Sequence, residues 1–223
     1  MNSDSVTFDA TYTERRSRLT SAFRYLLALP HLLFAGLWGY AANILAFLQW
    51  FVILFTGRRN EGMWGFQRAY LGYNVRVSSY ASLLYDEYPN FGSTWKDEPV
   101  AFGLDYEPDA NRLTNALRLI WMIPALVISL FLGIAVFFVL LVSWVVIIIT
   151  GRHPRGMWDF VLRVYCFSFE LSAYGMLMTD EYPRYEGSEP TSMLPPGDRA
   201  APYGIVQPGT GAPLPPPSSP PVG

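Results

Sequence analysis

The sequence predicts a mainly α-helical integral membrane protein, built from two tandem copies of one unit and containing about four transmembrane helices. Three observations support this fold class. Charged residues make up only 15% of the 223 residues, against about 25% in a soluble domain. Two long stretches, 25–57 and 119–151, contain no Lys, Arg, Asp or Glu, and each exceeds the roughly 20 apolar residues that cross a bilayer as a helix. The two halves of the chain also repeat each other.

The repeat is gapless. A shift of 94 residues aligns Val6–Pro89 with Val100–Pro183, and 29 of the 84 aligned positions are identical. Shared hydrophobicity does not explain these matches, because many are glycine, tryptophan or charged residues. The repeated motif positions are Gly57, Arg58, Gly62, Trp64, Asp86 and Glu87, and their counterparts Gly151, Arg152, Gly156, Trp158, Asp180 and Glu181. We therefore divide the chain into a first unit at 1–93, a second at 94–186, and a Pro-rich tail at 187–223 predicted to be disordered.

Each unit is predicted to begin with a short strand, because apolar residues alternate with others at 6–12 and again at 100–106. A lone strand leaves its backbone groups unpaired, so we expect the two strands to pair with each other. This pairing places both strands on one side of the membrane. It therefore implies an even number of crossings in each unit.

An arginine-bearing interfacial helix follows in each unit, at Glu14–Leu29 and Asp109–Ile123. Pro30 and Pro124 are expected to kink the chain or to start a new helix. The long transmembrane helices then run over His31–Phe55 and Ala125–Ile149, each about 37 Å long. A Thr-Gly-Arg turn ends each long helix, with glycine suited to a left-handed cap.

The third segment of each unit, at Gly62–Tyr85 and Gly156–Thr179, has helical length but carries more polar residues. We expect it to cross the membrane with its charged stripe turned inward; the alternative is a helix lying in the interface. Arg76 and Glu170 occupy equivalent positions with opposite charge. If the third segments meet at a pseudo-two-fold axis, these residues form an ion pair that locks the units together. The alternative is two independent interfacial side chains.

The predicted membrane spans and the charges beside them also predict the location of the chain ends. Four crossings place both chain ends on one face of a cell membrane, and the arginines before the first long helix favour a cytoplasmic face. The polar first 24 residues do not fit a cleavable signal peptide, so the first hydrophobic segment is expected to remain in the protein.

Catalytic and metal sites are not predicted. Cys166 is the only cysteine, and His31 and His153 have no ligand partners at metal-binding spacing. We find no cofactor motif. The neighbouring acids Asp86 and Glu87, repeated at 180–181, could serve acid–base chemistry; the simpler interpretation is helix-end carboxylates paired with arginines such as Arg18 and Arg112. A net charge of −2 argues against nucleic acid as a partner.

The motifs together resemble a bacterial membrane family, the domain-of-unknown-function 4389 family. The resemblance rests on Thr-Gly-Arg-x-x-x-Gly-Met-Trp-x-Phe followed by Asp-Glu-Tyr-Pro, and it covers each unit once, from Val6 to about Tyr185. The second copy also has the family's Gly-Arg-x-Pro-x-Gly turn, whereas the first has Asn60 in place of the proline. The resemblance implies a membrane location and no established activity.

Three functions fit these observations. The first is a non-catalytic membrane scaffold or accessory protein that offers its strands and Pro-rich tail to a protein partner. The second is a small transporter or channel with a site between the repeats, although Asn43, Gln49 and Ser143 are the only obvious polar groups in the long helices. The third is a protein that binds anionic lipid headgroups, with Arg18, Arg24, Arg112 and Arg118 as the candidate contacts.

Overall fold

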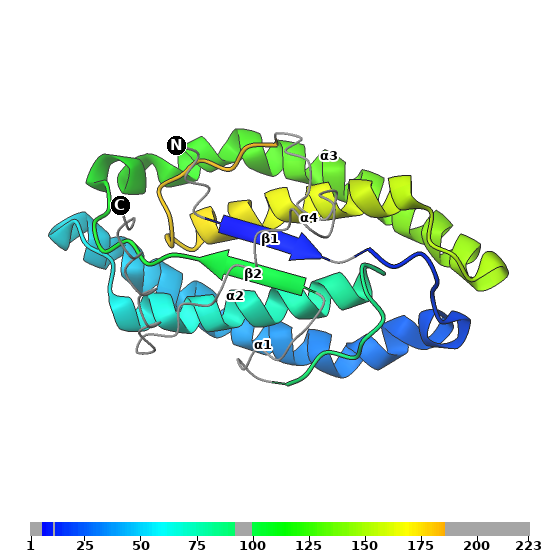
Figure 1. The fold of residues 1–223 in the computed structure, drawn as a ribbon. Coiled ribbons are helices and arrows are strands. Elements are labelled where there is room, and N and C mark those ends of the chain that lie inside the picture. The colour runs from blue at the N-terminus through cyan, green and yellow to red at the C-terminus, as the bar shows by residue number, and fades with distance from the viewer. Residues whose placement is uncertain (1–5, 11, 92–99, 186–223) are drawn as a thin grey trace, which may run out of the picture.

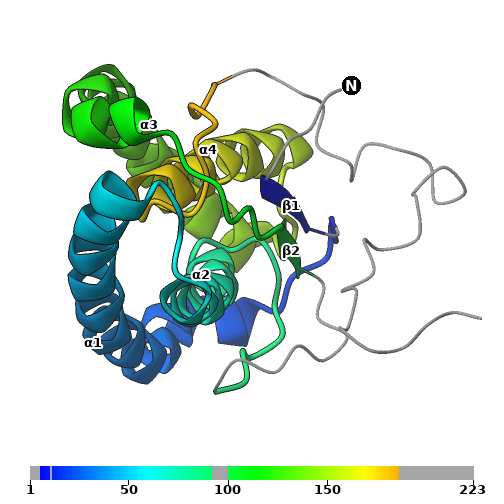
Figure 2. The same cartoon turned by 90° about the vertical axis from the view of Figure 1, so that its left-hand side faces the viewer.

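The computed structural model describes residues 6–10, 12–91 and 100–185, and Figure 1 shows their arrangement. Seen along the helix axes in Figure 2, the elements form three layers: the two long helices, then the two shorter helices, then two strands. The predicted tail at 187–223 lies outside the described residues. In chain order the elements are β1 (Val6–Ala10), α1 (Arg18–Thr56), α2 (Glu61–Ala81), β2 (Val100–Leu104), α3 (Arg112–Thr150) and α4 (Arg155–Gly175).

The predicted pairing of the two strands is confirmed. β1 pairs with β2 in antiparallel register, with Phe8 opposite Phe102. These two residues are equivalent in the two copies, so a pseudo-two-fold axis passes between them. The strands run alongside the helices rather than beyond their ends (Figure 1).

Each long helix is continuous, which corrects the prediction of separate interfacial and transmembrane helices. Pro30 lies inside α1 and Pro124 inside α3. A proline removes one backbone hydrogen bond and favours a bend. Helix α1 nevertheless continues, because Ala28 and His31 on either side of Pro30 are buried and hold it in place.

Both ends of each long helix are capped. Ser17 and Asn111 begin α1 and α3 by accepting hydrogen bonds from backbone N–H groups of the first turn. Gly57 and Gly151 end them with φ of 73° and 72°, in the left-handed region that favours glycine. The prediction of a left-handed glycine cap is therefore confirmed in both copies.

The two units pack in opposite directions. Trp50 Nε1 donates to the Asn115 carbonyl at 3.0 Å, and the equivalent Trp144 Nε1 donates to the Ser21 carbonyl at 2.9 Å. These contacts join the last turns of each long helix to the first turn of the other. Helices α1 and α3 are therefore antiparallel, and the pseudo-two-fold axis lies perpendicular to them.

The middle layer contains the core. Trp64, Leu71 and Tyr80 of α2 and Trp158 and Phe169 of α4 belong to one cluster of buried residues. Among the described residues, α1 and α3 are the two helices long and apolar enough to cross a membrane. The prediction of about four transmembrane helices counted α2 and α4 as well, but much of the surface of these helices is buried between the outer layers.

Candidate functional site

Helices α2 and α4 end in the same unusual turn, and the candidate site is built on it. The Leu84 N–H donates to the Ser79 carbonyl and the Leu83 N–H donates to the Tyr80 carbonyl, which is the hydrogen-bond pattern of a Schellman cap. Leu83 occupies the left-handed position with φ of 64°, and its counterpart Leu177 has the same value. A left-handed leucine is disfavoured by about 1–2 kcal/mol, so other contacts must hold the turn.

A buried arginine of the same unit supplies the first of these contacts. Arg24 Nη1 donates to the carbonyls of Tyr80 and Tyr85, and Arg24 Nη2 pairs with the Asp86 carboxylate. Equivalent bonds join Arg118 to Tyr174, Thr179 and Asp180. Each guanidinium also lies over a tyrosine ring, at 4.8 Å for Arg24 and 4.2 Å for Arg118.

The second set of contacts comes from the opposite unit. Trp158 Nε1 donates to the Leu84 carbonyl at 3.0 Å, and Trp64 Nε1 donates to the Met178 carbonyl at 3.2 Å. Each turn is thus held by tryptophan from the other copy. This exchange explains why the tryptophan of the Gly-Met-Trp motif is buried in both copies.

We use "Asp86 cluster" for Arg16, Arg24, Asp86, His153 and Trp158. "Asp180 cluster" denotes Arg59, Arg118, Asp180 and Trp64. The Asp86 cluster and the Asp180 cluster lie at opposite ends of the middle layer, because α2 and α4 are antiparallel.

The clusters differ in the source of their second guanidinium. Arg59 reaches from the first unit to Asp180, with Nη2 at 2.7 Å from Oδ1, and its Nε donates to the Leu177 carbonyl. Its counterpart in the other cluster is His153, which carries no guanidinium. Arg16 supplies the charge instead: its Nη1 lies 3.7 Å from Asp86 Oδ1, and its Nη2 donates to the Leu84 carbonyl.

His153 is buried beside these charges. Burial, together with nearby Arg16 and Arg24, lowers the pKa of His153 to about 4. The ring is therefore neutral at pH 7. Its backbone is fixed as in the other copy, because its N–H donates to the Glu14 carbonyl and its carbonyl accepts from Tyr12 Oη.

The geometry of both clusters favours structural clamping over proton transfer. Asp86 and Asp180 each form ion pairs with two arginines, so both carboxylates are occupied by contacts within the protein. Glu87 and Glu181 are exposed. Among the described residues, no group of three His, Cys, Asp or Glu side chains could hold a metal ion.

The carboxylates do pair with arginines, but not with the ones predicted. Arg24 and Arg118 were expected to touch lipid headgroups, yet both are buried and their guanidinium groups are bonded within the protein. Arg18 and Arg112 are exposed. They lie against the caps at Gly151 and Gly57, at the end of the opposite long helix.

The predicted ion pair between Arg76 and Glu170 does not form among the described residues. Arg76 Nε donates to the Gly72 carbonyl, and Glu170 accepts from the Arg184 N–H. The physical reason is the antiparallel packing of α2 and α4. Equivalent residues meet only near the middle of these helices, and both Arg76 and Glu170 lie towards the C-terminal ends.

The polar groups considered for a transport path do not gather. Asn43 donates to the Gly39 carbonyl of its own helix, and Ser143 contacts Met157. Gln49 is buried. Neither the hollow along α3 nor the hollow beside Tyr12 and Arg152 is lined by these residues.

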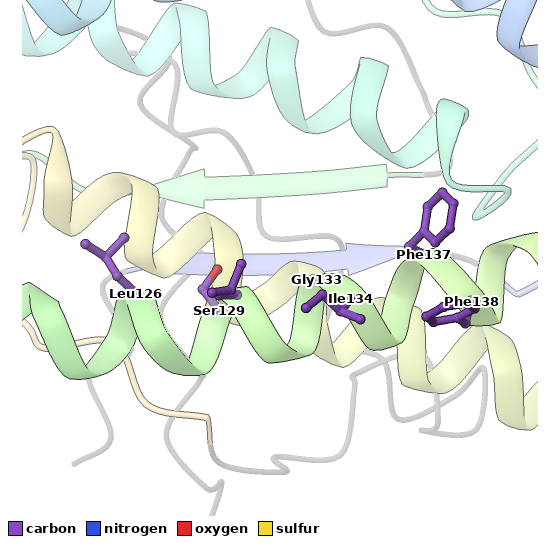
Figure 3. Close-up of a pocket in the computed structure, with 7 residues that line it drawn as sticks. Leu126, Ser129, Gly133, Ile134, Phe137 and Phe138 are labelled. Carbon is purple, nitrogen blue, oxygen red and sulfur yellow. The ribbon is translucent and has the colours of Figure 1, made fainter.

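A broad apolar surface, which we call the apolar face, covers the outer side of the two long helices. Leu33, Leu37 and Tyr40 of α1 are 73%, 72% and 75% exposed, and Leu130 and Phe131 of α3 are 63% and 67% exposed. One of the two hollows lies on this face, along α3 alone (Figure 3). Its lining residues include Leu126, Gly133, Ile134, Phe137 and Phe138.

Arg16, Arg59 and His153 were not predicted as site residues. The repeat weakens the signal for them, since Arg16 aligns with Ala110 and Arg59 with His153. Only the coincidence of these two differences could have identified them: the second copy has no guanidinium group at either position.

Comparison with known proteins identifies the units. A family model with the description "Domain of unknown function (DUF4389)" matches residues 18–93 and again residues 112–185. The resemblance inferred from the motifs is thus confirmed for both copies. No curated protein and no solved structure matches this chain.

Proposed function

We propose that this chain, which belongs to the domain-of-unknown-function 4389 family, is a non-catalytic membrane scaffold whose two long helices lie flat in one leaflet of the cell membrane. Helices α1 and α3 form the membrane-embedded layer. Helices α2 and α4 and the strand pair form a layer that faces water and is available to partners.

The extent of the apolar face carries this proposal. Exposed large apolar side chains run from Leu19 to Phe55 on α1 and from Leu113 to Ile149 on α3. At 1.5 Å per residue, each run is about 54 Å long, whereas the hydrocarbon core of a bilayer is about 30 Å thick. A crossing orientation would leave apolar rings in water at the helix ends. A flat orientation buries all of them.

The connection between the units also favours the flat orientation. After α2 the chain returns along the helices through β2 before α3 begins (Figure 1). If the helices crossed a membrane, an open two-stranded sheet would lie within the bilayer. Lipid-exposed sheet edges do not occur in the hydrocarbon region, because their backbone groups have no partners there.

The alternative functions receive less support. A transport path would need polar groups on a shared route, and Asn43, Gln49 and Ser143 do not provide one. Acid–base catalysis would need a carboxylate that can contact a substrate. Asp86 and Asp180 are each held by two guanidinium groups within the protein.

Cysteine labelling tests the orientation. Arg58 and Arg152 lie at opposite ends of the helix layer, and their side chains are 73% and 67% exposed. In a Cys166→Ser background, we expect Arg58→Cys and Arg152→Cys to react with an impermeant maleimide from the same side of sealed vesicles. Labelling from opposite sides would show that the helices cross the membrane and would overturn the proposal.

A second pair of variants tests the depth of the apolar face. Leu37→Cys and Phe131→Cys should react only after detergent extraction, because lipid covers both sites. Labelling of these sites in intact vesicles would mean that water reaches the apolar face, and it would overturn the proposal that lipid covers this face.

A further inference from the structure

The two ends of the helix layers carry opposite charge. One end, which we call the basic end, consists of the segment before α1 and the turn between α3 and α4, at 11–18 and 151–159. Apart from the buried arginine of the Asp86 cluster, its charged residues are Glu14, Arg15, Arg18, Arg152, Arg155 and Asp159. Four positive and two negative charges give this end a net charge of +2.

The equivalent end, which we call the acidic end, consists of the segment before α3 and the turn between α1 and α2, at 105–112 and 57–65. Apart from the buried arginine of the Asp180 cluster, its charged residues are Arg58, Glu61, Asp105, Glu107, Asp109 and Arg112. Two positive and four negative charges give this end a net charge of −2. The turns after α2 and α4 add one exposed glutamate to each end, Glu87 and Glu181, and do not alter the difference.

The backbone has the same arrangement at both ends. Arg15 stands opposite Arg152 in an isolated antiparallel β-bridge, and Asp109 stands opposite Arg58 in the equivalent bridge. Each bridge holds the segment before one long helix against the turn that follows the other. The two ends therefore share one backbone shape and differ in the charges that it carries.

Two pairs of equivalent positions produce the difference in sign. Arg15 of the first copy corresponds to Asp109 of the second, and Arg155 of the second copy corresponds to Glu61 of the first. All four residues are exposed. Exposed ion pairs contribute only about 0–1 kcal/mol to stability, so the fold itself gains little from this pattern.

The ends of one molecule are too far apart to neutralise each other. Helix α1 has 39 residues and is about 58 Å long at 1.5 Å per residue. Salt screens exposed charges beyond about 8 Å at physiological ionic strength. The basic end and the acidic end are therefore both available to a partner molecule.

We propose that the basic end binds the acidic end of a second copy of this chain, head to tail. Opposite charges on matching backbones attract, whereas two basic ends or two acidic ends repel each other. The charges therefore select a head-to-tail contact over a symmetric dimer of like ends. Such a contact leaves one end free on each side, so further copies can add.

In the flat orientation, which rests on the proposed function, this contact produces a straight row. The internal pseudo-two-fold axis crosses the three layers (Figure 2), so it lies along the membrane normal. Because the two ends share one backbone shape, they meet about a second pseudo-two-fold axis, and copies in one leaflet keep that axis along the normal as well. Two half-turns about parallel axes combine into a translation. The row therefore presents the water-facing layer at a regular spacing.

Exchange of the equivalent residues tests the contact. Arg15→Asp/Arg155→Glu changes the basic end from +2 to −2, and Asp109→Arg/Glu61→Arg changes the acidic end from −2 to +2. Each double variant then has two like ends. In sedimentation of the full chain in a non-ionic detergent, we expect either variant to self-associate at least about tenfold more weakly than wild type. An equimolar mixture of the two should associate as wild type does, because every contact again joins opposite charges.

A chain with all four substitutions is the matched control. It keeps the total charge of wild type and exchanges the two ends, so it should associate like wild type. Raising the salt from 0.1 M to 1 M shortens the screening length from about 10 Å to about 3 Å and should dissociate both proteins. Thermal melting of each variant verifies that it is folded.

Cysteine crosslinking measures the direction of the contact. Gly62 and Gly156 are equivalent exposed residues at the acidic and the basic end. In a Cys166→Ser background and phosphatidylcholine vesicles, Gly62→Cys and Gly156→Cys chains should be joined by a bismaleimide when they are mixed. Neither variant should form a crosslinked dimer by itself, since like ends do not meet.

The contact is supported by association that is lost in both like-ended variants and restored by their mixture. It is overturned if wild type remains monomeric in detergent and in vesicles, if the like-ended variants associate normally, or if one cysteine variant crosslinks alone. It is also overturned if loss of the basic end weakens only binding to vesicles that contain phosphatidylglycerol, since that end would then belong to a lipid surface. None of these results alters the flat orientation, which is decided by labelling of Arg58→Cys and Arg152→Cys.

Discussion

The Asp86 and Asp180 clusters hold the same strained turn with different side chains. Both use an arginine of their own long helix and a tryptophan of the opposite unit. The second guanidinium comes from the opposite unit in one case, as Arg59, and from the preceding segment of the same unit in the other, as Arg16. In both copies, two arginines therefore lie near the carboxylate of the turn. The second arginine comes from a different segment of the chain in each copy.

The largest effect is expected at the arginines that both clusters share. Arg24→Met and Arg118→Met each remove a donor from two buried carbonyls and leave one carboxylate with only one of its two arginines. Loss of one member of a buried charge pair costs about 3–5 kcal/mol, and we expect similar losses of unfolding free energy in the two copies. Chemical denaturation in detergent measures the unfolding free energy of each variant. A large difference between the two variants would mean that Arg24 and Arg118 do not stabilise their clusters in the same way.

We predict that the Asp180 cluster can take its second guanidinium from the position that Arg16 occupies in the Asp86 cluster. Arg59→His gives the Asp180 cluster the residue of the other copy and should cost about 3 kcal/mol, since bonds to a charged group each contribute about 1.5–3 kcal/mol. Adding Ala110→Arg installs the counterpart of Arg16 and should recover about half of that loss. If the double variant is no more stable than Arg59→His, the two arrangements are not interchangeable.

Acid should weaken the Asp86 cluster through His153. The folded pKa of about 4 lies below the usual value of 6.5, so the stabilisation is present above pH 6.5 and is lost as pH falls towards 4. By pH 5 the loss amounts to about 2 kcal/mol. Unfolding free energies between pH 7.5 and 4.5 should fall less steeply for His153→Gln than for wild type. Parallel curves would contradict the assignment to His153.

The smallest effect is expected at the exchanged tryptophans. Trp64→Phe and Trp158→Phe keep most of the packing but remove the hydrogen bond to the turn of the other unit. A buried carbonyl that loses its donor costs about 1–2 kcal/mol. The melting temperature should fall more for Trp64→Phe than for Trp158→Phe, because the Leu84 carbonyl keeps its bond from Arg16 Nη2. Trp121→Phe on the exposed side of α3 serves as a neutral control.

Much of the fold could be predicted because its signals are local. The period-two pattern of the strands, the glycine caps at Gly57 and Gly151, and the uncharged helices each depend on a few neighbouring residues. The prediction of separate helices on either side of Pro30 was wrong. It considered only the missing N–H of proline, whereas tertiary packing around Ala28 and His31 decides whether the helix continues.

The site was harder to predict because it depends on the relative direction of the units. A repeat in the sequence does not say whether its copies pack parallel or antiparallel, and this choice decides that Arg76 and Glu170 stay apart while Trp158 reaches Leu84. Arg24 was assigned to the interface since charges beside apolar runs usually lie there. Its actual partners are carbonyls of a turn that leucine, rather than glycine, completes.

The exchange of tryptophans between units also constrains biosynthesis. The bonds that complete the first turn and the first long helix join residues 74 and 65 positions apart, and the bond from Trp144 to Ser21 spans 123. The N-terminal unit therefore leaves the ribosome before its partners have been synthesised, with α1 already formed and its apolar surface uncovered. A nascent chain of this design needs a bilayer or a chaperone to cover the apolar side of α1 while the second unit is synthesised.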